Sequence, residues 1–221
     1  MTAGRTTYVN PIGPAEAGRL HRILDGLWPR PGEMASDTPA RLSRWRRGLS
    51  LAHDETPELS MEVAQVFQGG DPSWNAQEAV FQALALYAAH QQSVRVSMHS
   101  DAREEHRFGT SVGHALRELC VRAAPKHPRP WEDRDNAGVV RLTEAVLTSH
   151  SMPELVGHLR RTVPLLRGEA IPLDYTRLAR DVHDWSTRAR GRAADRWAMD
   201  FHEPVPHAAD ADDSHTDDEE Y

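Results

Sequence analysis

The sequence has few of the residues that mark secreted, membrane-spanning or cysteine-ligated metal proteins. Its 221 residues include a single cysteine, Cys120, so one chain can form neither an internal disulfide nor a cysteine-based zinc site. No apolar run approaches the roughly 18 residues of a transmembrane helix, and the first residues lack the apolar core of a signal peptide. These absences favour a protein of the reducing cytoplasm without a membrane partner.

Isoleucine is also scarce, with 3 residues, whereas alanine, leucine and arginine number 28, 19 and 25. The three abundant residues favour helices, and β-branched residues favour strands. Apolar residues recur at helical spacing, as Val139, Leu142 and Val146 do, and Val94–Met98 is the one strand-like segment. This periodicity predicts helices over 72–90, 136–148, 152–167, 172–185 and 191–202.

Prolines mark three helix starts, because proline at the first helical position loses no hydrogen bond. Thr38, Thr56 and Asp71 each precede one and offer a capping side chain. We therefore predict an all-α fold, a bundle of about eight to nine helices over 14–202. A division into two small helical lobes near 93–108 is compatible with the pattern. We expect a flexible N-terminus over 1–13 and a disordered acidic tail over 203–221.

The net charge of −7 hides an uneven distribution. The segment 203–221 holds eight acidic residues and no lysine or arginine, while 1–202 holds 26 basic and 25 acidic residues. The total argues against a nucleic-acid binder, which usually carries a basic surface. Residues 1–202 are close to neutral in total, but their arginines can still lie together on particular faces of the fold.

The first candidate basic face is the segment Arg41–Arg47. On a helix, Leu42 and Trp45 face inward, and the arginines occupy outward or flanking positions. One guanidinium group can donate two parallel hydrogen bonds to a phosphate, so a row of exposed arginines suits a nucleic-acid backbone. The alternative is a solvated face paired with nearby acids. The candidate residues are Arg41, Arg44, Arg46 and Arg47.

Two further groups of arginines lie in the C-terminal half. Arg160 and Arg161 are adjacent on a predicted helix, so both cannot be buried, and ordinary solvation is the alternative. The other group flanks the last helix, where pairing with Asp184, Asp195 or the acidic tail is the competing interpretation. Its members are Arg188, Arg190, Arg192 and Arg196.

Enzymatic chemistry has one weak candidate in the sequence. Metal-ligating residue types gather in 99–106, but their spacing matches no helical metal motif. A metal-dependent hydrolase that uses them is an alternative function, and a helical adaptor that binds only protein through its acidic tail is another. Cys120 lies in a helical context and is expected to be a buried, inert thiol. The metal-ligating residues are His99, Asp101, Glu104, Glu105 and His106.

Two segments resemble signatures of the CasB family. The stretch Gly109–Leu116, with the sequence GTSVGHAL, is similar to the family's G-x-S-x-G-x-A-L segment. The stretch Ile171–Asp181, with the sequence IPLDYTRLARD, resembles its later signature, which Trp185 continues. The step Leu159–Arg161 between them is similar too. The resemblance extends over 75–202, is looser before it, and does not account for the acidic tail.

CasB is the small subunit of the type I-E CRISPR surveillance complex, Cascade. The resemblance implies an all-α subunit that is not an enzyme, needs no cofactor and serves antiviral defence. Two copies would lie beside the guide RNA and help to hold the target DNA and displaced strand of the R-loop. The other partners would be the large and backbone subunits. The resemblance favours nucleic-acid contact by Arg46, Arg47, Arg160 and Arg161. The family is also basic in the regions that correspond to Arg103, Arg107, Arg188 and Arg190.

Overall fold

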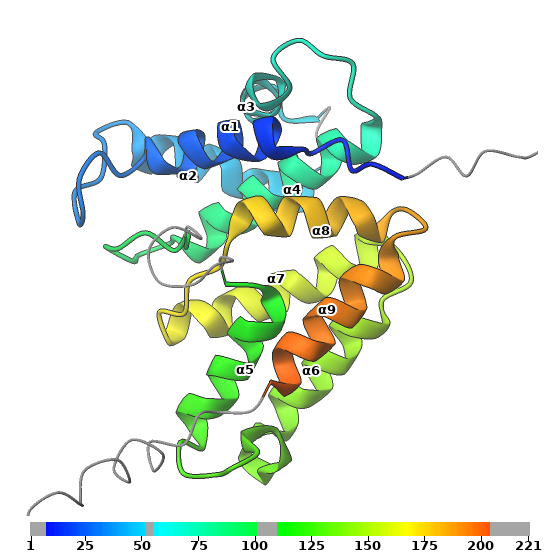
Figure 1. The fold of residues 1–221 in the computed structure, drawn as a ribbon. Helices are drawn as coiled ribbons and strands as arrows, with labels where there is room; N and C mark the ends of the chain where they lie inside the picture. Colours follow the sequence, from blue (N-terminus) through cyan, green and yellow to red (C-terminus); the bar gives the residue numbers. More distant parts are fainter. Residues whose placement is uncertain (1–7, 52–54, 101–109, 204–221) are drawn as a thin grey trace, which may run out of the picture.

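The computed structural model describes residues 8–51, 55–100 and 110–203, and this part of the chain is all-α, as predicted (Figure 1). Its α-helices are α1 (Pro14–Asp25), α2 (Thr38–Arg47), α3 (Pro57–Phe67), α4 (Trp74–His90), α5 (Val112–Ala123), α6 (Ala137–Thr148), α7 (Met152–Gly168), α8 (Tyr175–Trp185) and α9 (Arg190–His202). Short 3-10 helices occupy Gly48–Ser50, Pro130–Glu132 and Arg134–Asn136.

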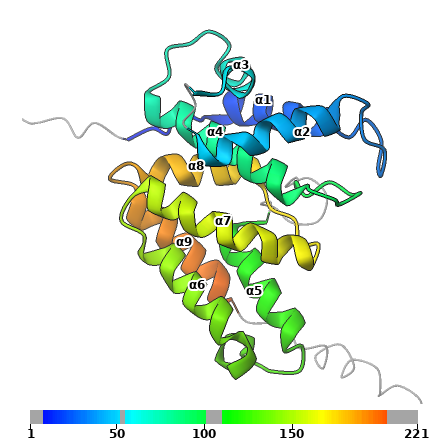
Figure 2. The ribbon, with the colours of Figure 1, turned by 180° about the vertical axis from the view of Figure 1, so that it is seen from behind.

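Helix α4 lies at the centre of the molecule. It packs on α8 across the middle, with α1, α2 and α3 at one end and α5, α6, α7 and α9 at the other (Figure 1). Seen from behind, α4 passes between α2 and α7, and it contacts both (Figure 2). Because α4 is apolar almost all round, nearly every residue in it is buried.

One cluster of buried apolar residues runs through both ends of the molecule. It includes Trp45 in α2, Tyr87 in α4 and Trp197 in α9, each at most 1% exposed. The division into two lobes near 93–108 stays a prediction. The described part of the predicted flexible N-terminus begins at Tyr8 and lies against α8, where Tyr8 donates to Asp184 over 2.9 Å.

The predicted helix starts are correct to within two residues. Thr56 precedes α3 as predicted. Asp37, rather than Thr38, is the N-cap residue of α2. Ser73, rather than Asp71, caps α4, because its hydroxyl accepts a hydrogen bond from the Ala76 backbone amide.

The strand-like segment Val94–Met98 forms no strand, and the described residues contain none. An isolated bridge joins His99 to Leu173 instead. The Leu173 amide donates to the Met98 carbonyl, and the Ser100 amide donates to the Leu173 carbonyl. The segment is therefore held against the chain that enters α8.

Candidate nucleic-acid interface

Two arginines approach the C-terminal end of α4 from opposite sides. Arg46 of α2 donates to the Ala88 carbonyl over 3.5 Å, and Arg167 of α7 donates to the Ala89 carbonyl over 3.1 Å. The last carbonyls of a helix have no partner within the helix and carry partial negative charge. The two guanidinium groups therefore stabilise this helix end and are held in place by it.

Arg160 approaches the same helix nearer its N-terminus. Its Nη2 lies 3.5 Å from Oε1 of Gln82, whose amide in turn donates to Glu78 over 2.7 Å. Partial burial lowers the pKa of Arg160, and the negative charge of Glu78 acts in the opposite direction. Because Arg160 and Arg167 are seven residues apart on α7, they lie on one face of it.

We call Arg46, Arg160 and Arg167 the α4 cationic surface. None of the three has an ion pair with a carboxylate among the described residues. Arg47 and Arg161, the next residues after Arg46 and Arg160, are exposed. Arg167 was not among the residues predicted from the sequence, although its spacing from Arg160 is the signal that identifies it.

Arg41 and Arg44 are not part of this surface, because no hydrogen bond of either with α4 is observed among the described residues. Arg41 donates to Glu62 of α3 over 2.9 Å, and its guanidinium lies 5.3 Å from the ring centre of Trp45. This ion pair is what the alternative interpretation of the basic helix predicts. Arg44 is half-buried. Arg103 and Arg107 lie outside the described residues.

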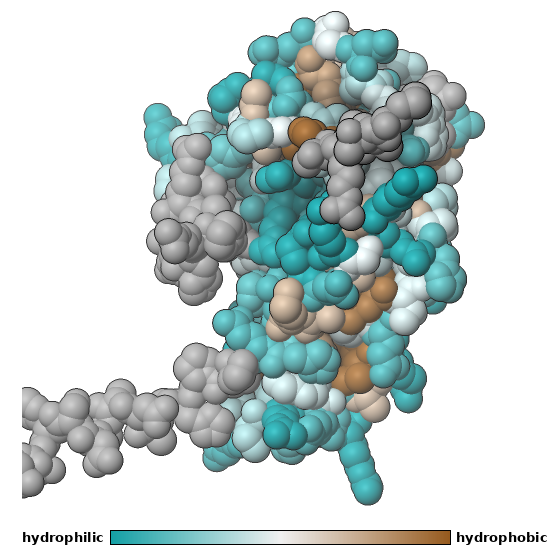
Figure 3. Space-filling model, turned by 45° about the vertical axis from the view of Figure 1, so that its right-hand side comes forward, coloured by the Kyte–Doolittle hydropathy of each residue, from teal (hydrophilic) through white to brown (hydrophobic). Residues whose placement is uncertain are grey.

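The arginines around the α8–α9 turn also differ in whether they form ion pairs. Arg188 is exposed, and Arg190 donates to the His150 carbonyl over 3.2 Å. Arg196 pairs with Asp181 and Asp184, at 2.6 and 3.6 Å, so for this residue the competing interpretation is confirmed. Hydrophilic side chains cover most of the face that Figure 3 brings forward, which includes this turn.

The proposed metal-ligating cluster is represented only by His99, because Asp101, Glu104, Glu105 and His106 lie outside the described residues. Both ring nitrogens of His99 are engaged. Nε2 lies 3.1 Å from Nδ1 of His21, and Nδ1 accepts a hydrogen bond from the Tyr175 amide over 3.2 Å. Within the described ranges, no group of three or more histidine, cysteine, aspartate or glutamate side chains could hold a metal ion.

Cys120 is buried, as predicted, and burial raises the pKa of its thiol to about 11. The thiolate is the reactive form of cysteine, so this side chain is inert at neutral pH. In the part of the chain that the structure describes, no helix has the length and apolar character needed to cross a membrane.

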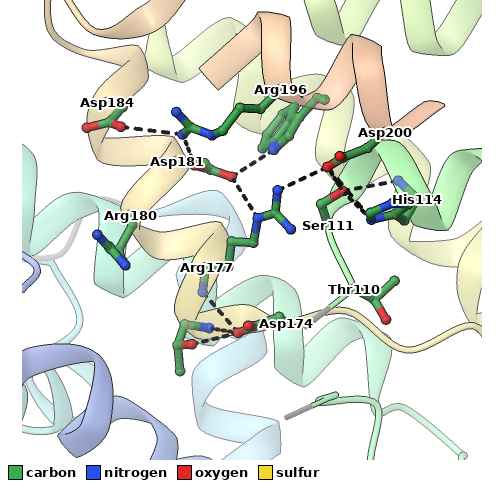
Figure 4. Close-up of polar contacts among 12 residues, drawn as sticks. Thr110, Ser111, His114, Asp174, Arg177, Arg180, Asp181, Asp184, Arg196 and Asp200 are labelled. Carbon is green, nitrogen blue, oxygen red and sulfur yellow. Dashed lines mark hydrogen bonds and ion pairs between the residues drawn. The ribbon is translucent and has the colours of Figure 1, made fainter. Parts of the chain in front are cut away.

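The first signature segment joins α5 to α9 (Figure 4). Ser111 is the N-cap of α5: its hydroxyl accepts from the His114 amide over 3.1 Å and donates to Asp200 of α9 over 2.5 Å. The spacing Gly109–Gly113 also fits a serine nucleophile motif, and the Ser111 hydroxyl lies 3.3 Å from Nδ1 of His114. Ser111 is only 2% exposed, however, and its hydroxyl is already used in the cap and in the bond to Asp200. The serine therefore has a structural role.

The second signature segment forms the start of α8 and part of a partly buried ion-pair network (Figure 4). Asp174 caps the helix by accepting from the amides of Thr176 and Arg177, and its own amide donates to the Thr110 carbonyl. The side chain of Arg177 donates to Asp200 over 3.0 Å. The two signatures thus meet through Thr110 and Asp200.

Asp181 is the most buried acid of this network. Arg196 donates to it over 2.6 Å, and the indole of Trp197 donates over 2.7 Å. Burial raises the pKa of Asp181, and Arg196, Trp197 and Arg177 act in the opposite direction. The conspicuous charged residues of this signature thus hold α8 and α9 together.

Known proteins resemble this chain in sequence and in fold. The family described as CRISPR-associated protein Cse2 matches residues 41–202. CasB from Thermobifida fusca is 25% identical with a TM-score of 0.60, and the alignment covers 86% of this chain and 97% of that one. CasB from Thermus thermophilus is 20% identical with a TM-score of 0.57, covering 87% and 98%.

A third solved structure, CasB of M. ruber, is 20% identical with a TM-score of 0.57 and covers 84% of this chain and 91% of its own. No curated protein sequence matches the chain significantly. The family match extends over well more than half of the chain and includes both signature segments. The chain therefore belongs to the CRISPR-associated Cse2 family, and this confirms the resemblance to the CasB family seen in its motifs.

Proposed function

We propose that the chain is the non-catalytic small subunit of a type I-E Cascade complex in the cytoplasm and takes part in antiviral defence. In this role it binds the nucleic-acid backbone and stabilises the R-loop formed by guide RNA and target DNA. Its partners are the large and backbone subunits, a second copy of itself, the guide RNA and the target DNA. Family membership supports the assignment to this complex.

The α4 cationic surface is the observation that supports backbone binding. A guanidinium carries five N–H donors, and the contacts of Arg46, Arg160 and Arg167 with α4 and its neighbours use only one or two of them in each case. The remaining donors can meet phosphate oxygens. Because α4 already holds these side chains, less conformational entropy is lost when a strand binds.

The contribution to R-loop stability is electrostatic. Base pairing with the guide determines the sequence, and the protein needs only to hold strands by their backbones. A displaced strand pairs again with its complement unless a cationic groove retains it. Contacts between arginine and phosphate also release counterions, so the binding weakens as salt increases.

The test uses the assembled complex with paired substitutions on the two helices. We expect Arg46→Ala with Arg47→Ala, and Arg160→Ala with Arg161→Ala, to weaken target DNA binding by at least tenfold each. The matched control is Arg134→Ala with Arg141→Ala, which removes two exposed arginines near and on α6. Thermal unfolding of each free variant checks that the fold is retained.

The proposal is contradicted if the complexes that carry the double substitutions on α2 and on α7 both bind target DNA with the affinity and the salt dependence of the unmodified complex. Loss of binding in the control pair to the same extent would contradict a specific role for the α4 cationic surface. Cleavage of nucleic acid by the purified chain with Mn²⁺ or Mg²⁺, abolished by chelator and by His106→Ala, would favour the hydrolase instead.

A further inference from the structure

A surface cavity of about 610 Å³ lies between α1, α2 and α3, at the end of the molecule shown uppermost in Figure 1. Three arginines line it, Arg19 and Arg22 of α1 and Arg41 of α2. Gln65 and Gln68 line it too. No carboxylate contributes to the lining, so the cavity is cationic.

Two of these arginines form ion pairs with acids that do not line the cavity. Arg19 donates to Glu16 over 2.5 Å and to the carbonyl oxygen of Val66. Arg41 donates to Glu62 over 2.9 Å.

The third guanidinium nitrogen of each of these two arginines is also engaged. Nη1 of Arg19 donates to Oε1 of Gln68 over 3.3 Å, and Nη1 of Arg41 lies 4.0 Å from Oδ2 of Asp37. These contacts fix the direction of both side chains. They use three of the five N–H donors of Arg19, so two donors of that guanidinium remain for a ligand.

Arg22 is different because it is exposed and has no ion pair among the described residues. It therefore brings the uncompensated positive charge of the cavity. An anion bound here would pair with Arg22 and receive further hydrogen bonds from the two fixed arginines.

The other lining groups indicate the class of ligand. The cavity is open to solvent, and its volume of about 610 Å³ has room for a molecule of the size of a nucleotide. Ile23 offers an apolar wall, and Gln65 offers a donor and an acceptor for a polar ring, whereas Oε1 of Gln68 already accepts from Arg19. We propose that this cavity binds the phosphate monoester of a nucleotide, either free or at the end of a strand.

The proposal does not rest on the proposed function, because the cavity contains none of the residues of the α4 cationic surface. The test is titration calorimetry of the full-length chain alone with AMP. We expect AMP to bind and adenosine not to bind, because the phosphate supplies the charge that Arg22 needs. Arg22→Gln should weaken AMP binding at least tenfold, and Arg22→Lys by less.

Matched controls separate this site from the α4 cationic surface. Arg141→Gln removes an exposed arginine of α6, and it should bind AMP like the unmodified chain. The same holds for Arg160→Ala with Arg161→Ala, so weaker R-loop binding in that variant has no bearing on the cavity. Thermal unfolding of Arg22→Gln should match that of the unmodified chain, because Arg22 is exposed and forms no ion pair with the described residues.

The source of the phosphate is distinguished with oligonucleotides. The ligand is a strand end if a short DNA with a 5′-phosphate binds more tightly than the same DNA with a 5′-hydroxyl. This difference in affinity should disappear in Arg22→Gln. AMP binding without that difference supports a free nucleotide. Equal affinity for AMP and adenosine, no binding of AMP at about 5 mM, or unchanged AMP binding in Arg22→Gln would overturn the proposal.

Discussion

A Cβ atom added to Gly113 of α5 would overlap the backbone carbonyl oxygen of Trp197 in α9. Backbone atoms cannot move aside as the end of a flexible side chain can. We therefore expect Gly113→Ala to lower the free energy of unfolding by about 3 kcal/mol, the upper part of the usual range for overpacking. Urea unfolding followed by circular dichroism measures this change.

The control for this prediction is Gly157→Ala in α7, where an added Cβ meets no described atom within 4 Å. In an open helical position, alanine should stabilise the protein by about 0.5 kcal/mol because it restricts the unfolded chain. Equal effects of the two substitutions would show that α5 and α9 do not pack closely at Gly113.

Removal of Arg196 should leave Asp181 as a poorly compensated buried charge. We expect Arg196→Met to lower the free energy of unfolding at pH 7 by about 2–4 kcal/mol, since Arg177 is 3.9 Å away and only the indole of Trp197 still donates at short range. The effect should shrink as the pH falls, because a protonated Asp181 no longer needs a cation. Arg192→Met, an exposed position of the same helix, should change stability by less than about 0.5 kcal/mol.

His90 should make the protein sensitive to acid. Burial, with a contribution from the positive charge of Arg167, lowers the pKa of His90 from 6.5 to about 4. A histidine with a lowered pKa in the folded state gives stability that is present above pH 6.5 and is lost as the pH falls toward 4. Between pH 7 and 4.5 this group should cost about 2–3 kcal/mol.

The comparison of His90→Phe with the unmodified chain isolates this effect. The variant lacks the titrating group, so its free energy of unfolding should fall less between pH 7 and 4.5. His150→Gln, at an exposed position, serves as the control and should follow the unmodified chain. Parallel pH profiles for His90→Phe and the unmodified chain would contradict the assignment.

The α4 cationic surface predicts a change in salt dependence as well as in affinity. The logarithm of the DNA-binding constant falls linearly with the logarithm of the salt concentration. We expect the triple variant Arg46→Gln, Arg160→Gln and Arg167→Gln to make this slope less steep by about 2–3, roughly one for each phosphate that it no longer neutralises. Target DNA binding by the assembled complex, measured over a range of salt concentrations, gives this slope. A lower affinity with an unchanged slope would indicate damage to the assembly rather than the removal of phosphate-binding groups.

The acidic tail over 203–221 predicts competition with nucleic acid. Its eight acids can act on the same arginines as a phosphate backbone, so a chain ending at His202 should bind single-stranded DNA more tightly at low salt. Equal affinity would remove this idea. Failure of the truncated chain to join the complex would instead support the protein-only adaptor.

Much of the fold could be predicted from local patterns. Apolar spacing identified α6, α7, α8 and α9 within a few residues, because a helix that buries one face must repeat apolar residues at its own period. The cap of α4 was misplaced because Asp71 and Ser73 are equally suitable capping residues. Only the hydrogen bond of Ser73 to the Ala76 amide decides between them. Val94–Met98 has strand-like residues, but it lies beside the start of α8 with no neighbouring strand among the described residues to pair with.

The candidate interface shows the limit of such patterns. Arg41 and Arg46 both flank the apolar stripe of one helix, yet Arg41 is paired with Glu62, 21 residues away, and Arg46 reaches Ala88, 42 residues away. No local spacing encodes either partner. The same holds for Arg196, which pairs with Asp181, and for Arg22, whose role in the cavity depends on how α1, α2 and α3 meet.

The sequence by itself determined the helical class, the family signatures and the uneven distribution of charge, because each follows from residue type and short-range spacing. Only the tertiary structure decided which arginines are neutralised and which keep donors for a phosphate. The physical reason is that an ion pair depends on distance in space, and helices far apart in the chain set that distance when they pack. Arg167 became part of the α4 cationic surface in this way, through its hydrogen bond to Ala89.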